Sequence, residues 1–520
     1  MRRFFSTVIL VMLASLVMAQ APVISRKKSQ DQPTTTSNKP SQKKPATQPT
    51  TPRRPTTGVL TITSTPSDAS VKLDNDYLGT TPITIRQQRP GTYTITFSAE
   101  GYETRSKTVT VTAGETTTCS ATLVQKGTTP PTSTTTNLTT ATPTTPSFEG
   151  MTPSEIGKKG RELYNEDKYS EALPYIYEAA KRGYMDSEFL MGYMSYYGEG
   201  VVINYEQAVY WYQKAAEHGS SAALNNLGFC YEEGRGVTQS WSEAVAYYRK
   251  AADGGSLVAC DNLGLCYENG KGVAKNANEA VFWYRKGAEG GHAGAQYHLA
   301  GCYYDGTGIE KDLTQAAYWY RKAADKGLAS AQRSLGYCYE YGVGVDKDYN
   351  EAFLWYKKSA EQEYASGMNS LGRCYQYGYG VSQDYVEAVK WYRKAADKGN
   401  KFGQYNLATC YEEGKGVLKD YAEAFAWYSK AAAQDHAAST EAVADYYYYG
   451  RGVEKSYSEA VTWYRKAADL GRNGAKYSLG WCYYYGQGVS IDKKEAYRWM
   501  KKAADSNYSK AQTFIDEHTF

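Results

Sequence analysis

After its first twenty residues the chain contains no long hydrophobic run. The one apolar stretch, from Phe4 to Val17, follows a basic Met-Arg-Arg start and ends just before Ala19. It is shorter than the ~20 residues that a membrane-spanning helix needs, and its flanks are typical of a secretory signal. We therefore predict a signal peptide over residues 1–19, with a retained membrane anchor as the alternative. The mature protein is expected to have no transmembrane segment and to be exported, to the periplasm or to the cell surface or extracellular space.

The chain also lacks a strong charge of either sign. Its formal charge is +4 over 520 residues, which is too small to imply a nucleic-acid partner. Much of the basic excess lies near the N-terminus, at Arg26, Lys27, Lys28, Lys43, Lys44, Arg53 and Arg54. These cations predict a solvated tail, with weak adhesion to anionic lipid or glycan as the alternative.

Catalytic signatures are missing as well. There are five histidines, and no His-Glu-x-x-His or Gly-x-Ser-x-Gly motif occurs, although these patterns are typical of zinc proteases and serine hydrolases. The Gly-x-Gly turns of the chain are not followed by Gly-Lys-Ser/Thr, so they do not predict a phosphate-binding loop. We expect no catalytic, cofactor-binding or metal-binding residues, no cofactor and no enzymatic activity.

Two segments have almost no apolar residues. Residues 20–57 consist largely of Thr, Pro, Gln, Ser and Lys, and residues 125–150 are dominated by Thr and Pro. Neither composition can bury a core, so both segments are predicted to be disordered linkers. Residues 58–124, which lie between them, alternate apolar with polar residues, as in Tyr93-Thr94-Ile95. This period of two predicts a small all-β sandwich of five or six strands.

Residues 58–124 also contain four short motifs. They are Pro66-Ser67-Asp68-Ala69, Gly79-Thr80-Thr81-Pro82, Pro90-Gly91-Thr92-Tyr93 and Gly101-Tyr102. Together these motifs resemble those of the PEGA domain, a small bacterial surface-associated module, although the tetrapeptide that gives the domain its name has Ser and Asp here in place of Glu and Gly. The resemblance implies an extracytoplasmic, non-catalytic domain that is often linked to binding or to envelope attachment.

From residue 185 to residue 508 a motif recurs nine times with a period of 36 residues. A fixed period of this length predicts a solenoid of stacked two-helix units. In each unit we expect Leu-Gly on the first helix, Gly-x-Gly-Val in the turn and Trp-Tyr-x-Lys-Ala-Ala on the second helix. Tyr247 fills the one gap in the tryptophan column, which comprises Trp211, Trp283, Trp319, Trp355, Trp391, Trp427, Trp463 and Trp499.

Seven of the nine cysteines share one position of the repeat. They are Cys230, Cys266, Cys302, Cys338, Cys374, Cys410 and Cys482. Equivalent positions on stacked helices lie roughly 8–10 Å apart, whereas the Cα atoms of a disulfide lie within about 7 Å. The cysteines are therefore predicted to be mostly free, buried thiols.

The repeated motifs resemble the Sel-1-like repeat, a relative of the tetratricopeptide repeat. The resemblance implies a right-handed superhelical solenoid over residues 185–508. A tetratricopeptide-like capping repeat is expected at residues 151–184, and a C-terminal capping helix at residues 509–520. The fold class expected for the whole chain is α+β multidomain: an all-α solenoid of Sel-1-like helix pairs that follows the PEGA-like sandwich.

In tetratricopeptide-type solenoids the first helices of the pairs build the concave wall, and the resemblance carries this role over to two columns of positions here. Both columns vary between repeats while the core columns do not, and both are rich in tyrosine, which suits polypeptide or glycan contact. The candidate partner-binding residues are Tyr193, Phe229, Tyr297, Tyr337, Arg373, Tyr405 and Trp481. The alternative is that these aromatic residues pack along the ridges between repeats.

Three functions follow from these observations. The first is a non-catalytic exported scaffold or adaptor that binds protein or peptide partners through the groove of the solenoid. The second is an envelope-anchoring or glycan-binding surface protein that acts through the PEGA-like domain. The third is a β-lactamase-like or cell-wall hydrolase, as described for cysteine-rich relatives; it is disfavoured because the first cysteine they carry is Ala252 here, and only Cys260 matches the second.

Overall fold

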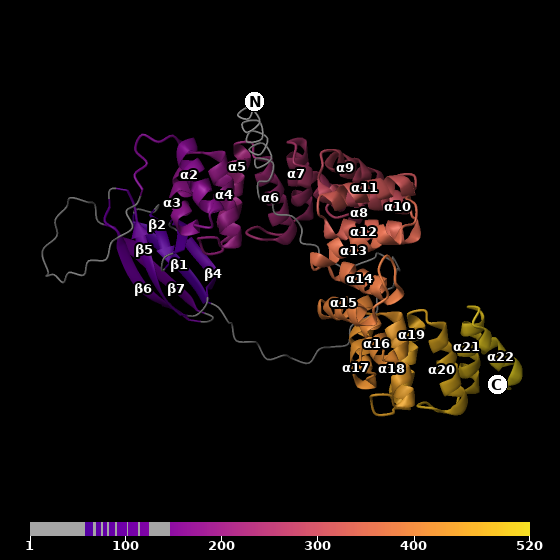
Figure 1. The fold of residues 1–520 in the computed structure, drawn as a ribbon. Coiled ribbons are helices and arrows are strands. Elements are labelled where there is room, and N and C mark those ends of the chain that lie inside the picture. Colours follow the sequence, from indigo (N-terminus) through magenta and orange to yellow (C-terminus); the bar gives the residue numbers. More distant parts are fainter. Residues whose placement is uncertain are drawn as a thin grey trace. The chain divides into compact units, whose positions relative to one another are not determined.

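The computed structural model describes residues 58–65, 69–73, 76–80, 83–88, 91–100, 102–112, 115–123 and 146–520. The expected signal peptide and the linker of residues 20–57 lie outside the described residues, as does most of the linker of residues 125–150. The chain divides into two compact units, Met1–Trp283 and Tyr284–Phe520. Figure 1 labels the helices of both units and most strands of the first.

The β-domain of the first unit contains two sheets around one core (Figure 1). Its strands are β1 (Gly58–Thr65), β2 (Ser70–Leu73), β3 (Asp76–Thr80), β4 (Ile83–Gln88), β5 (Gly91–Ser98), β6 (Arg105–Val111) and β7 (Thr116–Thr122). One sheet has the order β4-β1-β7 with β1 and β7 parallel, and the other has the order β3-β2-β5-β6 with antiparallel neighbours. Leu60, Ile62, Val71, Ile95 and Phe97 are completely buried in the core, which confirms the predicted sandwich.

The described part of this domain has seven strands, more than the five or six expected from the sequence. The last strand, β7, contains no large apolar residue and is mostly threonine. Threonine favours strands because it is β-branched, and the small residues Cys119 and Ala121 supply the buried face. A search for alternating large apolar residues therefore overlooks this strand.

Helices of the first unit follow one another along the chain, and consecutive helices pack together. They are α2 (Pro153–Asn165), α3 (Tyr169–Lys181), α4 (Met185–Tyr197), α5 (Tyr205–Glu217), α6 (Ser221–Glu233), α7 (Trp241–Asp253) and α8 (Leu257–Asn269). The next helix, α9 (Ala277–Glu289), contains the boundary between the two units.

The second unit shows the same packing of each helix on the next (Figure 1), and its helices have 12 or 13 residues except α22, which has 9. Its helices are α10 (Ala293–Asp305), α11 (Leu313–Asp325), α12 (Ala329–Tyr341), α13 (Tyr349–Glu361), α14 (Ala365–Tyr377), α15 (Tyr385–Asp397), α16 (Lys401–Glu413), α17 (Tyr421–Ala432), α18 (Ala437–Tyr449), α19 (Tyr457–Asp469), α20 (Asn473–Tyr485), α21 (Lys493–Ala504) and α22 (Ser509–Glu517). We call the even-numbered helices α4 to α20 helices A and the odd-numbered helices α5 to α21 helices B. Positions are counted from the first residue of each helix, so Tyr337 is position 9 of α12.

The ends of the helices are fixed by local side chains. Asp384 begins α15, where its carboxylate accepts hydrogen bonds from the amides of Val386 and Glu387 at 2.8 and 3.0 Å. Gly378 ends α14 with φ +73°, a left-handed conformation that glycine adopts without strain. These capping residues explain why the helix pairs start and stop at the same repeat positions.

The second glycine of each Gly-x-Gly turn has a further role between repeats. A Cβ atom on Gly380 would lie 2.1 Å from the carbonyl oxygen of Tyr349, the first residue of the preceding helix B. Since the backbone has φ +67° there, glycine is required both for its conformation and for this close approach. The turn of one repeat thus packs directly on the helix B of the repeat before it.

The gap between helices A and B is filled mainly by the tyrosine that follows the repeat tryptophan. Tyr392 is completely buried there, and a Cβ atom on Gly372 would lie 2.7 Å from its ring. The Leu-Gly glycine therefore makes room for the tyrosine that follows the tryptophan. Trp391 itself is only half-buried, although other members of its column such as Trp427 are buried.

Candidate partner-binding surface

All seven candidate residues lie at position 5 or position 9 of helices A. Tyr193 and Phe229 belong to α4 and α6 in the first unit. The second unit contains Tyr297 on α10, Tyr337 on α12, Arg373 on α14, Tyr405 on α16 and Trp481 on α20. Each of the seven is half-buried, so part of each side chain is available to a partner and part is used in packing.

The aromatic members of this set support neighbouring rings. Tyr193 lies 4.5 Å from Tyr197, measured between ring centroids, and Tyr337 lies 4.6 Å from Tyr341. Other ring pairs are Phe229–Tyr196, Tyr297–Tyr320, Tyr405–Tyr428 and Trp481–Phe514, with centroids 6.3, 5.6, 5.7 and 5.4 Å apart. Packing along the ridges is therefore one role of these residues, and partner binding by them stays a prediction.

Arg373 is the charged member and is held in a network between two repeats. Its guanidinium donates to the carboxylate of Glu340 at 2.8 Å and to the hydroxyl of Tyr341 at 3.0 Å. Burial opposes the charge of Arg373, but the bond to Tyr341 and the charge of Glu340 outweigh it and raise the pKa. Glu340 also accepts a hydrogen bond from the buried hydroxyl of Tyr356 at 2.7 Å. The network fixes the positions of Arg373 and Tyr341.

The most exposed tyrosines on helices A occupy position 13, which the sequence did not single out. The exposed fraction is 49% for Tyr341, 53% for Tyr377, 58% for Tyr449 and 43% for Tyr485. These four residues, all in the second unit, are called the tyrosine edge below. Tyr197 holds the same position in α4, whereas the remaining helices A carry Glu233, Asn269, Asp305 and Glu413 there, all exposed.

Helix geometry provides the signal that could have revealed this edge. Residues four apart lie on the same helix face, so position 13 continues the face of position 9 by one turn. Position 13 is also the last residue before the capping glycine, where neighbouring helices no longer cover the side chain. Of the two tyrosine-containing columns at positions 9 and 13, the one at position 13 is nearer the C-terminal end of the helix and is therefore the more exposed.

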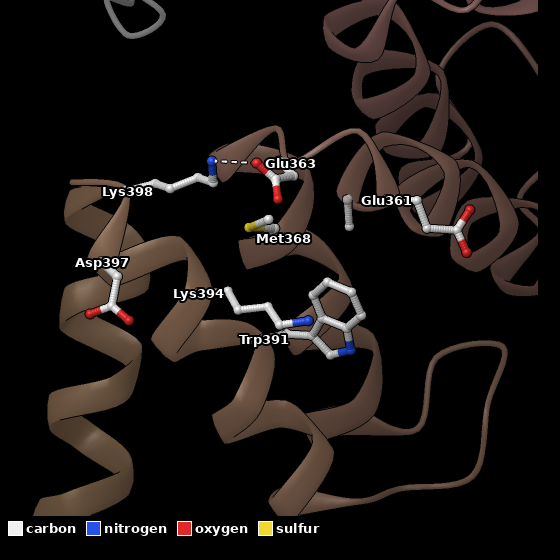
Figure 2. A pocket seen from close by; sticks show the side chains of 8 residues that line it. Glu361, Glu363, Met368, Trp391, Lys394, Asp397 and Lys398 are labelled. Atoms are coloured by element: carbon white, nitrogen blue, oxygen red, sulfur yellow. Dashed lines mark hydrogen bonds and ion pairs between the residues drawn. The ribbon is translucent and has the colours of Figure 1, made fainter.

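A hollow of about 430 Å³ lies beside the C-terminal ends of α13 and α15 (Figure 2). Trp391 and Met368 form its apolar wall, and Lys398 pairs with Glu363 at 2.9 Å at its rim. The ammonium of Lys394 lies 4.1 Å from the centroid of the Trp391 ring. Charges of both signs surround the hollow, so it favours neither a cation nor an anion.

The hollow lies where one repeat departs from its neighbours. In the repeats on either side, Gln332 and Gln404 donate hydrogen bonds to the carbonyl oxygens of Ala324 and Ala396 at 3.2 and 3.3 Å. Met368 replaces this glutamine and makes no such bond, because a thioether has no hydrogen to donate. No serine, threonine, cysteine or histidine lines the hollow.

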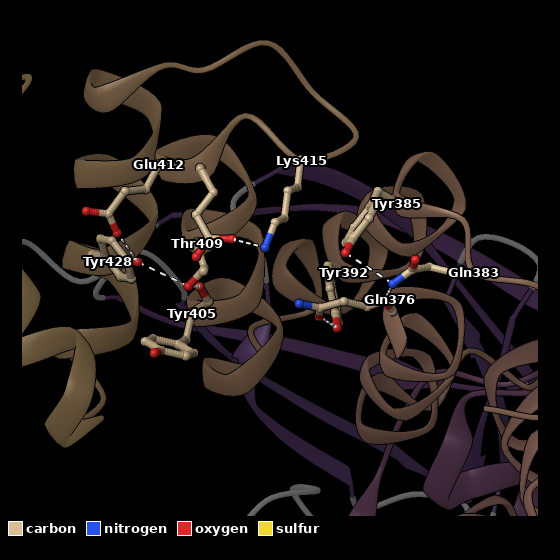
Figure 3. Close-up of polar contacts among 10 residues, drawn as sticks. Gln376, Gln383, Tyr385, Tyr392, Tyr405, Thr409, Glu412, Lys415 and Tyr428 are labelled. Atoms are coloured by element: carbon tan, nitrogen blue, oxygen red, sulfur yellow. Dashed lines mark hydrogen bonds and ion pairs between the residues drawn. The ribbon is translucent and has the colours of Figure 1, made fainter. Parts of the chain in front are cut away.

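Hydrogen bonds from helix B to helix A stiffen the surface. The hydroxyl of Tyr428 donates to Glu412 at 2.8 Å and lies 3.1 Å from the hydroxyl of Thr409 (Figure 3). In the preceding repeat, Gln376 stands at the position equivalent to Glu412 and accepts a hydrogen bond from Tyr392 (Figure 3). In both repeats the hydroxyl of the buried tyrosine at position 8 of helix B is therefore hydrogen-bonded to the residue at position 12 of helix A.

Two family models match the chain. The PEGA domain matches residues 57–127. The Sel1 repeat matches residues 186–220, 221–256, 257–292, 293–328, 329–364, 365–400, 402–436, 437–471 and 474–508. The chain belongs to the Sel1 repeat family. These matches confirm both resemblances drawn from the sequence motifs, and Sel1 repeat proteins are generally scaffolds for protein interaction.

A solved structure supports the Sel1 repeat fold. A protective antigen present in uropathogenic Escherichia coli strains, which displays an SLR fold, is 35% identical with a TM-score of 0.57; the match covers 70% of this chain and 79% of that one. A Sel1 repeat protein from Oxalobacter formigenes is 35% identical with a TM-score of 0.43, and the match covers 46% of this chain and 96% of that one. No curated protein matches the chain.

The Sel1 repeat core explains the cysteine column. All nine cysteines are buried, and Cys119, Cys230, Cys338, Cys374, Cys410 and Cys482 are free thiols, as predicted. Burial raises the pKa of Cys338 and Cys410 to about 11. Since the thiolate is the reactive form, these side chains act as small apolar core residues.

Two further observations concern only the described part of the Sel1 repeat chain. None of its helices combines the length and the apolar content that crossing a bilayer requires. Within the same residues, no group of three or more His, Cys, Asp or Glu side chains is arranged to hold a metal ion. Sel1-type and tetratricopeptide-like solenoids are typically non-catalytic.

Proposed function

We propose that this chain is a non-catalytic scaffold or adaptor that binds protein or peptide partners through the helix-A face of its Sel1 repeats. The observation that carries the proposal is the tyrosine edge, where four aromatic side chains at the ends of helices A are 43–58% exposed, whereas the tyrosines at positions 5 and 9 of these helices are half-buried. Exposed aromatic residues that are already held in position favour binding, because little side-chain freedom is lost when a partner arrives.

The partner-binding residues predicted from sequence have a defined part in this proposal. Tyr337 and Arg373 hold Tyr341 in place from below, and Trp481 does the same for Tyr485, with ring centroids 4.6 Å apart. A partner that covers the tyrosine edge would also contact the exposed parts of these supporting residues. Tyrosine, tryptophan and arginine are enriched at protein interfaces, where they supply much of the binding energy.

Export to the periplasm or the cell surface is part of the proposal. It is supported by the basic start and short apolar run of residues 1–19 and by the match to a protective antigen of uropathogenic Escherichia coli strains. Cell fractionation of the full chain, beside a variant that lacks residues 2–19, tests it. We expect only the full chain in the envelope or the medium, and equal distribution of the two would contradict export.

Attachment to the envelope or to a glycan through the PEGA domain is the second candidate function. It is favoured by the PEGA match at residues 57–127 and by the cations that precede it. Deletion of residues 20–124 should release the protein from washed envelopes if this function dominates. If the scaffold function dominates, the deletion should leave the protein bound to its partner.

A pull-down from envelope extract tests the scaffold function directly. The full mature chain is compared with a variant in which Tyr341, Tyr377, Tyr449 and Tyr485 are all changed to alanine. The matched control carries alanine at Tyr318, Leu354 and Tyr497, which lie on helices B and are 40–49% exposed. A partner bound by the wild type and the control but lost from the tyrosine variant supports the proposal; equal capture by all three proteins refutes it.

A further inference from the structure

Two members of the tyrosine edge, Tyr341 on α12 and Tyr377 on α14, form a pre-ordered pair. The hydroxyl of Tyr341 accepts from Arg373 at 3.0 Å, and its ring lies 4.6 Å from that of Tyr337. The Tyr377 ring lies 5.5 Å from the Tyr379 ring with an interplanar angle of 26°. Both rings are therefore about half exposed and yet held by neighbours.

The spacing of this pair follows from the repeat. Helix α12 contacts α14, and α14 contacts α16, in addition to the helices B between them. Packed helices have axes about 8–10 Å apart, so equivalent residues on consecutive helices A share this spacing. An extended polyproline II segment has three residues per turn and rises about 9.3 Å per turn. Prolines spaced three apart in such a segment match tyrosines spaced one repeat apart.

The next residue in the same column is an acid. Position 13 of α16 is Glu413, whose side chain is 43% exposed and pairs with Lys415 at 2.7 Å. An exposed ion pair of this kind contributes little, typically below about 1 kcal/mol, so an incoming cation can replace Lys415. The column thus presents two rings and then a carboxylate on three consecutive helices A.

One segment of the chain has the complementary order. Residues 49–55 read Pro49-Thr50-Thr51-Pro52-Arg53-Arg54-Pro55, with prolines at every third position. They lie outside the described residues. Residues 26–54 contain eight Lys or Arg and one Asp, so they carry +7 of a chain whose total is +4, and the rest of the chain is acidic.

We propose that Tyr341, Tyr377 and Glu413 bind the segment Pro49–Pro55 of a second copy of this chain. Pro49 and Pro52 stack on the two tyrosine rings, and Arg53 and Arg54 meet the carboxylate. Aromatic grooves that recognise proline-rich segments use the same chemistry, because a polyproline II helix is already ordered before it binds. The inference rests on the proposed function, since it names one partner for the same face.

A column on helices B supplies a matched control. Tyr318 on α11 and Leu354 on α13 are 48% and 49% exposed, like the tyrosine pair. The next residue in that column is Lys390 rather than an acid, which would repel Arg53 and Arg54. The two columns therefore have similar apolar exposure and opposite charge.

The test is binding of a fluorescent peptide with the sequence of residues 45–57, measured by anisotropy. The host is the full mature chain carrying Pro49→Ala, Pro52→Ala and Pro55→Ala, so that its own segment does not compete. We expect Tyr341→Ala with Tyr377→Ala to weaken binding by about tenfold or more, as loss of central aromatic contacts does. Glu413→Gln should weaken it several-fold at low salt, and Tyr318→Ala with Leu354→Ala should change it less than twofold.

Two controls keep the inference open to refutation. A peptide with its three prolines at residues 49, 52 and 55 changed to alanine should bind about tenfold more weakly; equal binding overturns the inference. Displacement of the peptide by a chitin hexasaccharide at lower concentration than by unlabelled peptide would instead assign the face to glycan. Circular dichroism melting of each variant confirms that the fold is retained.

Sedimentation velocity of the full mature chain tests the second copy. We expect association that increases with concentration and is lost with Tyr341→Ala and Tyr377→Ala. A chain that stays monomeric at concentrations where the peptide binds overturns the assignment to a second copy. If the peptide does not bind while the pull-down still captures an envelope protein through the tyrosine edge, this inference fails and the proposed scaffold function stands.

Discussion

Two substitutions of Glu340 distinguish the two hydrogen bonds that its carboxylate accepts in the network beneath Tyr341. Its side chain is 4% exposed and accepts from the Tyr356 hydroxyl at 2.7 Å and from Arg373 at 2.8 Å. Glu340→Gln keeps an acceptor for Tyr356 and removes the charge that Arg373 faces. Glu340→Ala removes both interactions. The next repeat shows that glutamine suits this position, because Gln376 accepts from Tyr392 there.

The expected costs follow from what each variant leaves unpaired. The side chain of Arg373 is 31% exposed and can turn towards solvent, so Glu340→Gln should cost about 1–2 kcal/mol. Glu340→Ala also leaves the hydroxyl of Tyr356, which is 1% exposed, without an acceptor. That group adds about 1–3 kcal/mol, so the alanine variant should be less stable than the glutamine variant by about 2 kcal/mol.

Hydrogen exchange is the suitable assay, because solenoid repeats unfold locally and a single global midpoint would average over them. A difference of about 2 kcal/mol speeds exchange roughly 30-fold for amides that open with this region. The effect should appear in α12 and α13 and not in α19 to α21. Equal exchange in the glutamine and alanine variants would show that the Tyr356 hydroxyl does not depend on Glu340 and would refute the reasoning.

Three further predictions concern the second unit and the cysteines. Gly380→Ala should cost about 3 kcal/mol or more because it adds strain and a clash, whereas Gly399→Ala, with φ +83° and no atom within 4 Å of the added Cβ, should cost about 1 kcal/mol; urea unfolding compares them. Burial, followed by the charges of Lys401 and Arg472, lowers the pKa of His436 to about 4 from 6.5. The unfolded chain therefore gains a proton first as pH falls, and stability should drop between pH 6.5 and 4 by at most about 3 kcal/mol; His436→Asn, which keeps the helix cap, should flatten this dependence in urea titrations. The buried free thiols should not react with a thiol reagent in the native protein and should react after unfolding, so rapid labelling of the native protein would contradict their burial.

The repeat period and the helix pairs could be predicted from the sequence because each unit repeats the same local signals. Asp384 and Gly378 fix the helix ends through contacts within a few residues, and such contacts leave a motif. The close approach that also requires glycine at Gly380 could not be predicted from a local motif. Its close neighbour is the carbonyl oxygen of Tyr349 in the preceding repeat, and contacts between repeats leave no local pattern.

The candidate site was predicted in part for a similar reason. Position 9 and position 13 both vary between repeats and both contain tyrosine, so sequence variation selects the helix-A face without ranking its residues. The ranking depends on how far neighbouring helices cover each turn, and this places Tyr337 beneath Tyr341. The hollow at Met368 was missed because it is formed by residues of two helices B and the helix A between them, and contacts between helices leave no local pattern.

Departures from the repeat pattern differ between the core and the surface. In α18, Tyr448 stands at position 12, where α16 has Glu412; the hydroxyl of Tyr464 donates instead to Asp445, at 2.6 Å. This change is compensated because a buried hydroxyl without an acceptor is costly. At position 13 the chain changes between tyrosine and Glu413, and the partners of Tyr341 and Glu413, Arg373 and Lys415, are themselves partly exposed, so the change leaves no buried group unpaired. Uncompensated variation of this kind is expected where a surface is shaped by what binds to it, so variants at position 13 should alter binding while leaving the melting temperature within a few degrees.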